Sequence, residues 1–485
     1  MRKNVLKIHP NDNVLVALTN LTKGDIISFE GVDYLIQENI PAKHKFFMQD
    51  MAAGDEIIMY GVLVGKLQQD AKMGSRMSTE NTRHATQPYS WRNKKFEWKA
   101  PDVSKFKERT FNGYYRSNGR VGTANYWLFI PTVFCENRNL DVIREAMHNE
   151  LGYAVTDKYK QYTKQLAVAF AKGEDISSVN FVPSSLKESK SVRTFSNVDG
   201  IKFLTHQGGC GGIRQDAAIL SKLLASYADH PNVGGVTVLS LGCQNLQIHD
   251  FRNDLKAYNP NFDKPLFIFE QQQSQSEEQL IAEAIRKTFE GLIEINKLER
   301  KPATLDKLTI GVKCGGSDGF SGISANPAVG YCSDLLVALG GKVLLAEFPE
   351  LCGVEQEIVD RSTDEATAMK FIRLMKSYEE IVTKAGSSFS MNPSPGNIKD
   401  GLITDAMKSA GAAKKGGTSP VVDVLDYTEP ATKPGLSLVC TPGNDVEATT
   451  GKAASGATLI LFTTGLGTTT GNPVCPTIKV STNSA

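Results

Sequence analysis

Five apolar runs of the chain each lead into a cysteine at the start of a polar or glycine-rich turn. The runs cover residues 127–135, 201–210, 236–243, 308–314 and 436–440. Apolar and β-branched runs bounded by glycine predict buried strands of a parallel sheet. Ligand sites of open α/β sheets lie outside the carboxyl ends of the strands. We therefore expect these thiols at the edge where chemistry is done, with cysteines that serve only packing as the alternative.

Between these runs, apolar residues recur with the 3.6-residue period of an amphipathic helix. The apolar stripes cover residues 140–150, 212–227, 276–298 and 363–384. Strands that alternate with helices predict a parallel sheet covered on both faces. A break at residues 298–302 indicates a seam between a central α/β domain at 111–302 and a C-terminal α/β domain at 303–485. The predicted fold class is α/β, with two doubly wound, Rossmann-like halves.

The beginning of the chain follows another pattern. Strand-like runs at 14–18, 25–29, 32–36 and 56–60 are separated by turn residues, which predicts a small β-rich domain at 1–88. Residues 89–110 have no period and are interpreted as a linker.

Composition and charge exclude several classes of protein. The 485 residues exceed one ordinary domain, and 54 Lys+Arg nearly balance 53 Asp+Glu, so we expect no nucleic-acid partner. No apolar run approaches the roughly 20 residues of a membrane helix, and the N-terminus lacks the apolar region of a signal peptide. The eight cysteines are too sparse for a disulfide scaffold. We expect a cytoplasmic protein whose cysteines bind metal or act in catalysis.

Two glycine-rich loops carry candidate chemistry. The loop at 205–216 holds His206 and Cys210 before a helix whose N-terminus favours an anion. It lacks the dinucleotide fingerprint G-x-G-x-x-G, so a NAD-dependent oxidoreductase is only a minor alternative. The loop that begins at Lys313 brings a cation, a thiol and the carboxylate of Asp318 within six residues. A turn chosen only for tightness is the alternative for both loops.

Three further segments offer ligand groups. A third loop, at 463–473, contains hydroxyls such as that of Thr464 and suits a polyol or a carboxylate. Arg116 and Arg120 are four residues apart around a glycine turn, a spacing that could clamp a carboxylate. His44 lies in a polar turn between two lysines. The alternatives are a solvated loop for 463–473, a surface turn for the two arginines and a structural role for His44.

Several motifs together resemble one known family. Residues 40–65 resemble a SAF domain, the small β-rich fold of type III antifreeze proteins and sialic acid synthases. Motifs in the rest of the chain resemble the altronate/galactarate dehydratase family. They are Phe111-Asn-Gly-Tyr-Tyr-Arg, Gly-Cys-Gly after His206, Lys313-Cys-Gly-Gly-Ser-Asp, Asn326-Pro, Pro442-Gly-Asn-Asp and Pro476-Thr-Ile-Lys-Val-Ser-Thr-Asn. The resemblance implies a hydro-lyase of hexuronate catabolism that converts a hexonic or hexaric acid to a 2-keto-3-deoxy sugar acid. D-altronate is the expected substrate and galactarate the second choice.

The resemblance and the residue types suggest roles for individual side chains. Substrate binding is expected from Arg116, Arg120, Asn326 and Thr464. Catalysis is expected from Lys313, Asp318 and Cys314, with Lys313 as the base if burial lowers its pKa and Asp318 as the competing base. The expected metal ligands are His44, His206, Cys210 and Cys243.

The resemblance implies dependence on a divalent metal, Fe2+ or Mn2+, which would act as a Lewis acid. The alternative is an iron–sulfur cluster on Cys135, Cys210, Cys243 or Cys314. The partner is expected to be a small sugar acid, with no membrane contact and a possible homo-oligomer. A non-catalytic sugar-acid-binding or regulatory protein on the same scaffold is the alternative function.

The sequence also departs from the family pattern. Members commonly have Asp and Arg where this chain has Asn118 and Ala124, Glu where it has Gln244, and histidines where it reads Ser78-Thr-Glu-Asn81. Members continue beyond the motif in which this chain ends, so we expect a truncated C-terminal domain.

Overall fold

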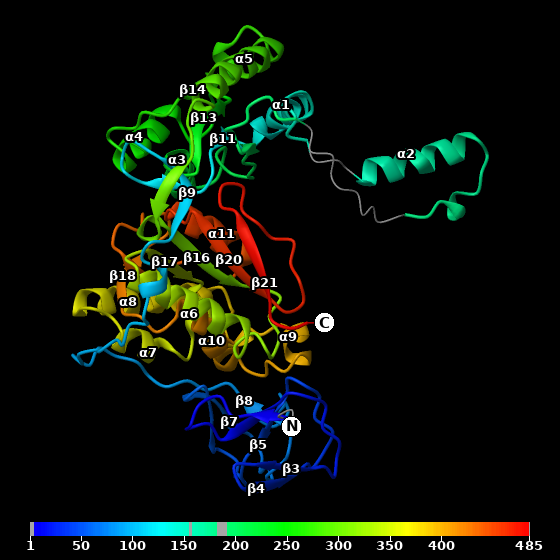
Figure 1. Cartoon of the computed structure of the whole chain (residues 1–485), viewed down its shortest axis with the longest axis vertical. Coiled ribbons are helices and arrows are strands. Elements are labelled where there is room, and N and C mark those ends of the chain that lie inside the picture. Colours follow the sequence, from blue (N-terminus) through cyan, green and yellow to red (C-terminus); the bar gives the residue numbers. More distant parts are fainter. Residues whose placement is uncertain (1–3, 155–157, 182–191, 485) are drawn as a thin grey trace. The chain divides into compact units, whose positions relative to one another are not determined.

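The chain divides into two compact units. Figure 1 shows the whole chain coloured by residue number. The computed structural model describes residues 4–154, 158–181 and 192–484. Unit 1 comprises Met1–Thr123, Ala225–Asn232 and Arg300–Ala485, and unit 2 comprises Ala124–Leu224 and Val233–Glu299.

Residues 4–88, called here the N-terminal β domain, form three small antiparallel sheets. Their strand orders are β1-β2-β5, β3-β4 and β6-β7-β8. The strands are β1 (Val5–Leu6), β2 (Val14–Ala17), β3 (Ile26–Phe29), β4 (Val32–Leu35), β5 (Lys45–Phe47), β6 (Glu56–Met59), β7 (Val62–Leu67) and β8 (Thr82–Arg83). The four predicted strand-like runs correspond to β2, β3, β4 and β6.

The segment after this domain contains one short helix, η1 (Ser104–Phe106), and then enters a small antiparallel sheet. This sheet has the order β10-β9-β15 and consists of β9 (Thr110–Tyr115), β10 (Val121–Gly122) and β15 (Lys301–Thr304). The break predicted at 298–302 thus contains the start of a strand. β15 accommodates Pro302 because it lies at the sheet edge, where a missing N–H is tolerated.

Unit 2 is built on a four-stranded parallel sheet of order β12-β11-β13-β14. The strands are β11 (Tyr126–Pro131), β12 (Gly200–Phe203), β13 (Val233–Ser240) and β14 (Leu266–Glu270). The helices of this part of the sequence are α1 (Asn137–Glu150), α2 (Lys158–Ala171), α3 (Arg214–Asp229), α4 (Ile248–Tyr258) and α5 (Glu277–Ile295). The fully buried Trp127 stacks on Phe267 with ring centroids 5.9 Å apart.

The α/β part of unit 1 is a six-stranded parallel sheet of order β18-β19-β17-β16-β20-β21. Its strands are β16 (Thr309–Cys314), β17 (Lys342–Ala346), β18 (Val421–Leu425), β19 (Gly435–Val439), β20 (Leu459–Thr464) and β21 (Thr477–Ser481). The helices are α6 (Ala325–Ala338), α7 (Glu355–Asp360), α8 (Glu365–Lys384), α9 (Pro395–Lys399), α10 (Asp405–Ala413) and α11 (Asp445–Ala454). Both sheets confirm the predicted α/β class, and all five cysteine-leading runs contain parallel strands.

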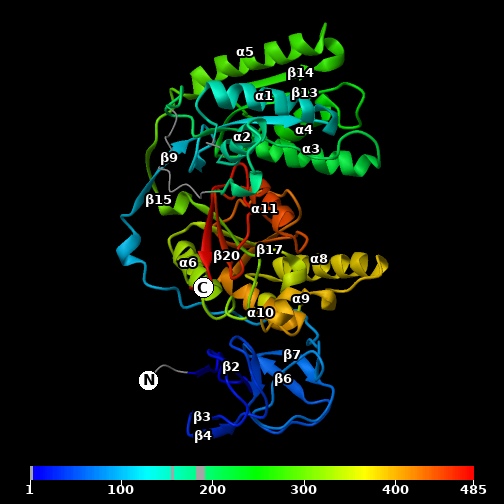
Figure 2. The same ribbon diagram turned by 90° about the vertical axis from the view of Figure 1, so that its right-hand side faces the viewer.

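The N-terminal β domain packs directly on the six-stranded part of unit 1. Phe47 and Met59 belong to the same buried apolar cluster as Val312 of β16, Leu345 of β17 and Met407 of α10. Figure 2 shows the blue strands next to α10, which contacts β7. The continuous apolar core explains why both parts belong to one unit. Among the described helices, none combines the length and apolar character that a membrane crossing requires.

Candidate functional site

The carboxyl end of β16 presents Lys313 to two acidic residues. Lys313 Nζ lies 2.8 Å from Asp445 Oδ1 and also pairs with Glu347. Glu347 follows β17, the neighbour of β16, and Asp445 begins α11 after β19. Gly315 lets the chain pass Asp445 closely, because a Cβ there would meet both carboxylate oxygens at 2.5 Å. Adjacent parallel strand ends thus bring the three charged groups together.

The charges around Lys313 decide its protonation state. Burial by itself lowers the pKa of Lys313, but Glu347 and Glu350, followed by Cys314 and Asp445, raise it above its ordinary value. Lys313 is therefore a cation at neutral pH. The condition under which it would be a base, a pKa lowered by burial, is not met, because carboxylates surround the ammonium group.

Cys314 and Glu350 are held by two further lysines. Lys415 Nζ lies 3.2 Å from Cys314 Sγ and 3.8 Å from Glu350 Oε2, and Lys408 Nζ lies 3.1 Å from Glu350 Oε1. Although burial opposes ionisation, the lysines hold the pKa of Glu350 well below its ordinary value. Burial raises the pKa of Cys314, so this thiol is protonated at neutral pH.

Lys452 of α11 completes the group, which we call the lysine–carboxylate cluster. Its members are Lys313, Cys314, Glu347, Glu350, Lys408, Lys415, Asp445 and Lys452. Lys452 is fully buried, and its Nζ has no hydrogen-bond partner among the described residues. Burial lowers its pKa to about 7. It is the member of the cluster best suited to accept a proton at neutral pH.

Asp318 lies four residues beyond Cys314 and is saturated with hydrogen bonds. Its Oδ1 accepts from Ser321 Oγ at 3.0 Å and Thr482 Oγ1 at 2.9 Å, and its Oδ2 accepts from Asn483 Nδ2 at 3.0 Å. Burial raises its pKa, but Lys43 and the hydroxyl donors outweigh burial and lower it. An ionised carboxylate with donors on both oxygens is a weak base, so this environment favours a role in holding the loop.

The turn around His44 in the N-terminal β domain contacts residues 399–401. His44 Nε2 lies 3.0 Å from Lys399 O, and His44 Nδ1 is buried without a hydrogen-bond partner among the described residues. Burial also lowers the pKa of His44. The fully buried Lys45 donates to Gly401 O at 2.7 Å, and burial lowers its pKa to about 7. The turn therefore brings a neutral imidazole and a buried amine to residues 399–401 of the C-terminal part of unit 1.

Two predicted substrate ligands lie at the same sheet edge. The Asn326 amide donates to Gly411 O at 3.0 Å and accepts from Thr463 Oγ1 at 2.6 Å. The Thr464 hydroxyl accepts from Gly467 N at 3.0 Å. Both side chains stabilise neighbouring loops, and their contact with substrate stays a prediction.

The predicted arginine clamp lies in the β10-β9-β15 sheet. Arg120 pairs with Asp229 and donates to its carbonyl at 2.7 Å, and Arg116 Nε donates to Pro231 O at 2.8 Å. These contacts anchor the β9–β10 turn. Carboxylate binding stays a prediction that requires Arg120 to leave Asp229.

In unit 2, three thiols follow three adjacent parallel strands. Cys135 lies in η2 (Phe134–Glu136) after β11, Cys210 follows β12 and Cys243 follows β13. Backbone hydrogen bonds join the three loops, from Phe134 N to Gly208 O at 3.0 Å and from Asn245 N to Cys210 O at 3.2 Å. None of the three thiols forms a disulfide; Cys135 and Cys243 are exposed and Cys210 is half-buried.

The remaining predicted ligand of unit 2 has no free ring nitrogen. His206 Nε2 lies 2.8 Å from Pro131 O, and His206 Nδ1 accepts from Gly208 N at 3.1 Å. The ring therefore joins the ends of β11 and β12. Metal binding by His206 stays a prediction that requires one of these bonds to break.

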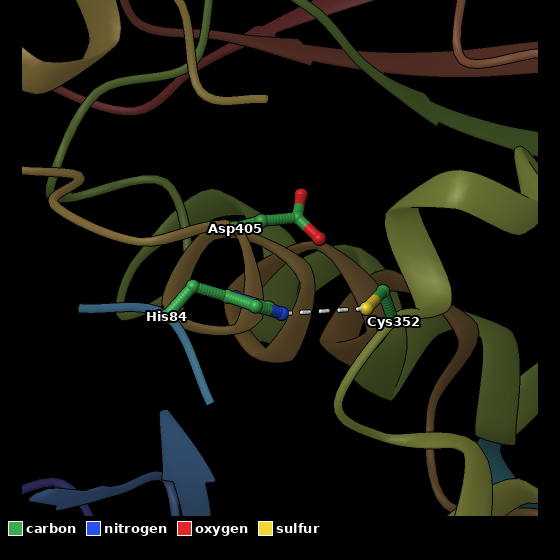
Figure 3. A group of neighbouring side chains, drawn as sticks. All are labelled: His84, Cys352 and Asp405. Atoms are coloured by element: carbon green, nitrogen blue, oxygen red, sulfur yellow. Dashed lines mark hydrogen bonds between the residues drawn. The ribbon is translucent and has the colours of Figure 1, made fainter. Parts of the chain in front are cut away.

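The four predicted metal ligands belong to two units, His44 to unit 1 and His206, Cys210 and Cys243 to unit 2, and metal binding by them stays a prediction. Within the described ranges, one group of three His, Cys, Asp or Glu ligand atoms lies within 4.8 Å, and it consists of His84, Cys352 and Asp405 (Figure 3). It contains none of the four predicted ligands. The thiols of Cys135, Cys210 and Cys243, which follow adjacent strands, are donors of the kind that an iron–sulfur cluster takes.

Sequence reasoning missed much of the lysine–carboxylate cluster. Glu347 and Glu350 directly follow the buried run at 342–346, and Asp445 follows the quoted motif Pro442-Gly-Asn. A search of every strand end for carboxylates would have found them. Lys408, Lys415 and Lys452 lie in or beside helices and carry no local signal.

Comparisons with known proteins agree with this architecture. Residues 3–85 match the altronate/galactarate dehydratase SAF domain, residues 113–296 match the D-galactarate dehydratase/altronate hydrolase second domain, and residues 305–485 match the D-galactarate/altronate dehydratase C-terminal domain. The β-rich domain at the N-terminus is thus a SAF domain.

Three relatives are similar over nearly the whole chain. Altronate dehydratase of Bacillus subtilis is 35% identical over 99% of this chain and 87% of its own length. Altronate dehydratase of Escherichia coli is 34% identical over the same shares. Galactarate dehydratase (L-threo-forming) of Escherichia coli is 28% identical over 98% of this chain and 84% of its own length. This chain belongs to the altronate/galactarate dehydratase family of hydro-lyases.

Proposed function

We propose that this protein removes water from a hexonic or hexaric sugar acid, with D-altronate preferred and galactarate second. The product is a 2-keto-3-deoxy sugar acid. Support comes from the family and from one observation, an amine in the lysine–carboxylate cluster that has a pKa of about 7 and no hydrogen-bond partner among the described residues. A base and fixed positive charge are what this elimination requires.

The reaction breaks two bonds of the substrate. A base takes the C2 proton, the 3-hydroxyl leaves as water after receiving a proton, and the resulting enol tautomerises to the 2-keto acid. The substrate carboxylate makes the C2 proton weakly acidic because negative charge is already present beside it.

We assign proton removal to Lys452. Its neutral amine is available near pH 7 because burial lowers its pKa to about 7, with Lys313 and Lys415 lowering it further and Glu347 opposing them. Lys313 stays a cation and stabilises the negative charge that develops on the substrate carboxylate. Asp445, whose side chain is 30% exposed, marks the open side of the cluster.

The cofactor belongs to the same proposal. The thiols of Cys135, Cys210 and Cys243 in unit 2 would be the ligands of an iron–sulfur cluster, and Lewis-acidic iron is the chemistry that such a cofactor would supply. A single Fe2+ or Mn2+ ion remains the other expected cofactor. Metal analysis of the anaerobically purified protein distinguishes the two.

The test is an assay of anaerobically purified protein, supplied with Fe2+ or Mn2+, on a panel of aldonic and aldaric acids. We expect 2-keto product from D-altronate at the highest kcat/KM, and a large loss of kcat in Lys452→Met. Absence of product from every acid would refute the dehydratase. If D-altronate then raises the thermal unfolding midpoint without product, the protein is a sugar-acid-binding protein instead.

A further inference from the structure

Three side chains from distant parts of the sequence meet in unit 1, and none of them is a predicted site residue (Figure 3). His84 directly follows β8, Cys352 directly follows η6 (Phe348–Leu351), and Asp405 is the first residue of α10. His84 Nε2 lies 3.9 Å from Cys352 Sγ, and one ligand atom from each residue lies within 4.8 Å of the others. An imidazole, a thiol and a carboxylate thus share one place in unit 1.

Asp405 provides a second, independent observation. Its side chain is fully buried, and neither carboxylate oxygen has a hydrogen-bond partner among the described residues. A buried carboxylate without a partner is costly, and such groups are normally paired with a cation or bound to a metal. A bound cation would give this carboxylate the partner that it lacks among the described residues.

We propose that His84, Cys352 and Asp405 bind a zinc ion that joins the end of the N-terminal β domain to η6 and α10. Nitrogen, sulfur and oxygen donors of this kind are the ligands that Zn2+ takes in proteins. One thiolate and one carboxylate balance the charge of the divalent ion. The buried site is then neutral, and a fourth position remains for water or another ligand.

The distance between His84 and Cys352 requires only a small contraction, and the distances to Asp405 are at most 4.8 Å. Zinc ligands at about 2.0–2.3 Å in a tetrahedron lie roughly 3.5 Å from one another, against the present 3.9 Å between His84 Nε2 and Cys352 Sγ. Ligation through Nε2 places the ring proton on Nδ1. That change gives up one long contact, of 3.4 Å, from Ala406 N.

The same residues are poorly suited to nucleophilic catalysis. Cys352 is buried, and burial, followed by the charge of Asp405, raises the pKa of its thiol. A reactive cysteine is instead an accessible thiolate. A bound cation, which displaces the protons of its ligands, would form the thiolate here.

The proposed ion would also position part of the lysine–carboxylate cluster. Cys352 lies two residues after Glu350, and Asp405 lies about one turn before Lys408 on α10. Glu350 and Lys408 form the 3.1 Å ion pair described above. Zinc would fix the two segments that carry this pair, although the proposal does not depend on the dehydratase activity.

The probe is Co2+, added to the reduced, chelator-treated whole chain in which Cys135, Cys210 and Cys243 are replaced by Ser. Circular dichroism first confirms that this chain is folded. We expect a thiolate-to-cobalt charge-transfer band that saturates at one Co2+ per chain and disappears on addition of one equivalent of Zn2+. Either no band or a band unaffected by Zn2+ would overturn the proposal.

Three further substitutions in this chain test which residues give rise to the charge-transfer band. Cys352→Ser and His84→Gln should abolish it, whereas Cys332→Ser, which changes an exposed cysteine of α6, should leave it unchanged. Because His84 is only half-buried, His84→Gln is expected to fold even if Cys352→Ser does not. Zn2+ should raise the thermal unfolding midpoint of the parent chain and not that of His84→Gln. Survival of the band in folded His84→Gln would refute ligation by His84.

Discussion

Lys43 Nζ of the N-terminal β domain lies 3.1 Å from Asp318 Oδ2 in the glycine-rich loop after β16. The Asp318 side chain is fully buried, and Lys43 lies 3.5 Å from Asp400 as well. Lys43 adopts a φ of +77°, a left-handed conformation that a lysine rarely takes. Gly319 allows this approach, because a Cβ there would meet Lys43 at 2.7 Å. The ion pair thus ties the SAF domain to the loop that carries Lys313 and Cys314.

Loss of this pair should lower both stability and turnover. We expect Lys43→Gln to reduce the free energy of unfolding by about 1–3 kcal/mol, because it leaves a buried carboxylate without its cation. Lys72→Gln is the matched control, since Lys72 pairs with Asp50 at the same 3.1 Å on the exposed surface. Urea unfolding measures both variants, and equal effects of the two would contradict a special role for Lys43.

Lys452 should make stability depend on pH in a defined direction. Its pKa is about 7 in the folded chain against an ordinary value of 10.5, so the unfolded state binds more protons between these values. The contribution of Lys452 to stability therefore rises with pH from about 7 to 10.5. Lys452→Met should be more stable than the parent chain at pH 7, with a gain that shrinks as pH rises.

Urea midpoints at pH 7, 8 and 9 test this behaviour. Lys376→Met, a substitution of an exposed lysine on α8, provides the control and should leave the pH dependence unchanged. A constant difference between Lys452→Met and the parent chain across this range would show that Lys452 is charged throughout. In that case it could not be the base.

The thiols of unit 2 should determine the iron content. We expect Cys135→Ser, Cys210→Ser and Cys243→Ser each to lose bound iron and visible absorption after anaerobic purification, because all three follow adjacent strands of one sheet. Cys332→Ser, at an exposed cysteine of α6, should retain both. Full iron content in all three variants would exclude these thiols as ligands.

Arg120 should act mainly on stability. Its partner Asp229 is buried, with a side chain 6% exposed. We expect Arg120→Met to lower the free energy of unfolding by about 1–3 kcal/mol because the carboxylate loses a charged donor. Arg138→Met breaks an exposed arginine–carboxylate pair with Glu277 and should have little effect. A raised KM with unchanged unfolding would instead support the predicted substrate clamp.

The pattern of apolar residues was sufficient to predict several of the strands and helices and the glycine-rich loops. β11, β12, β13, β16 and β19 coincide with the five cysteine-leading runs, and α1, α3, α5 and α8 with the predicted helical stripes. Strands and helices are local features, because their periods are repeated within a few residues. Lys313, Cys314 and Asp318 could likewise be located on one loop.

Tertiary structure alone decided the chemical state of that loop. Burial of Lys313 predicted a lowered pKa, whereas the carboxylates brought in by β17 and α11 raise it. Lys452 carries no sequence signal, yet its burial without a partner makes it the candidate base. His84 is far in sequence from Cys352 and Asp405, and the three meet only because the fold brings His84 against Cys352 and the start of α10. Protonation and ligand geometry depend on which charges are neighbours in space, and no local pattern of residues specifies those neighbours.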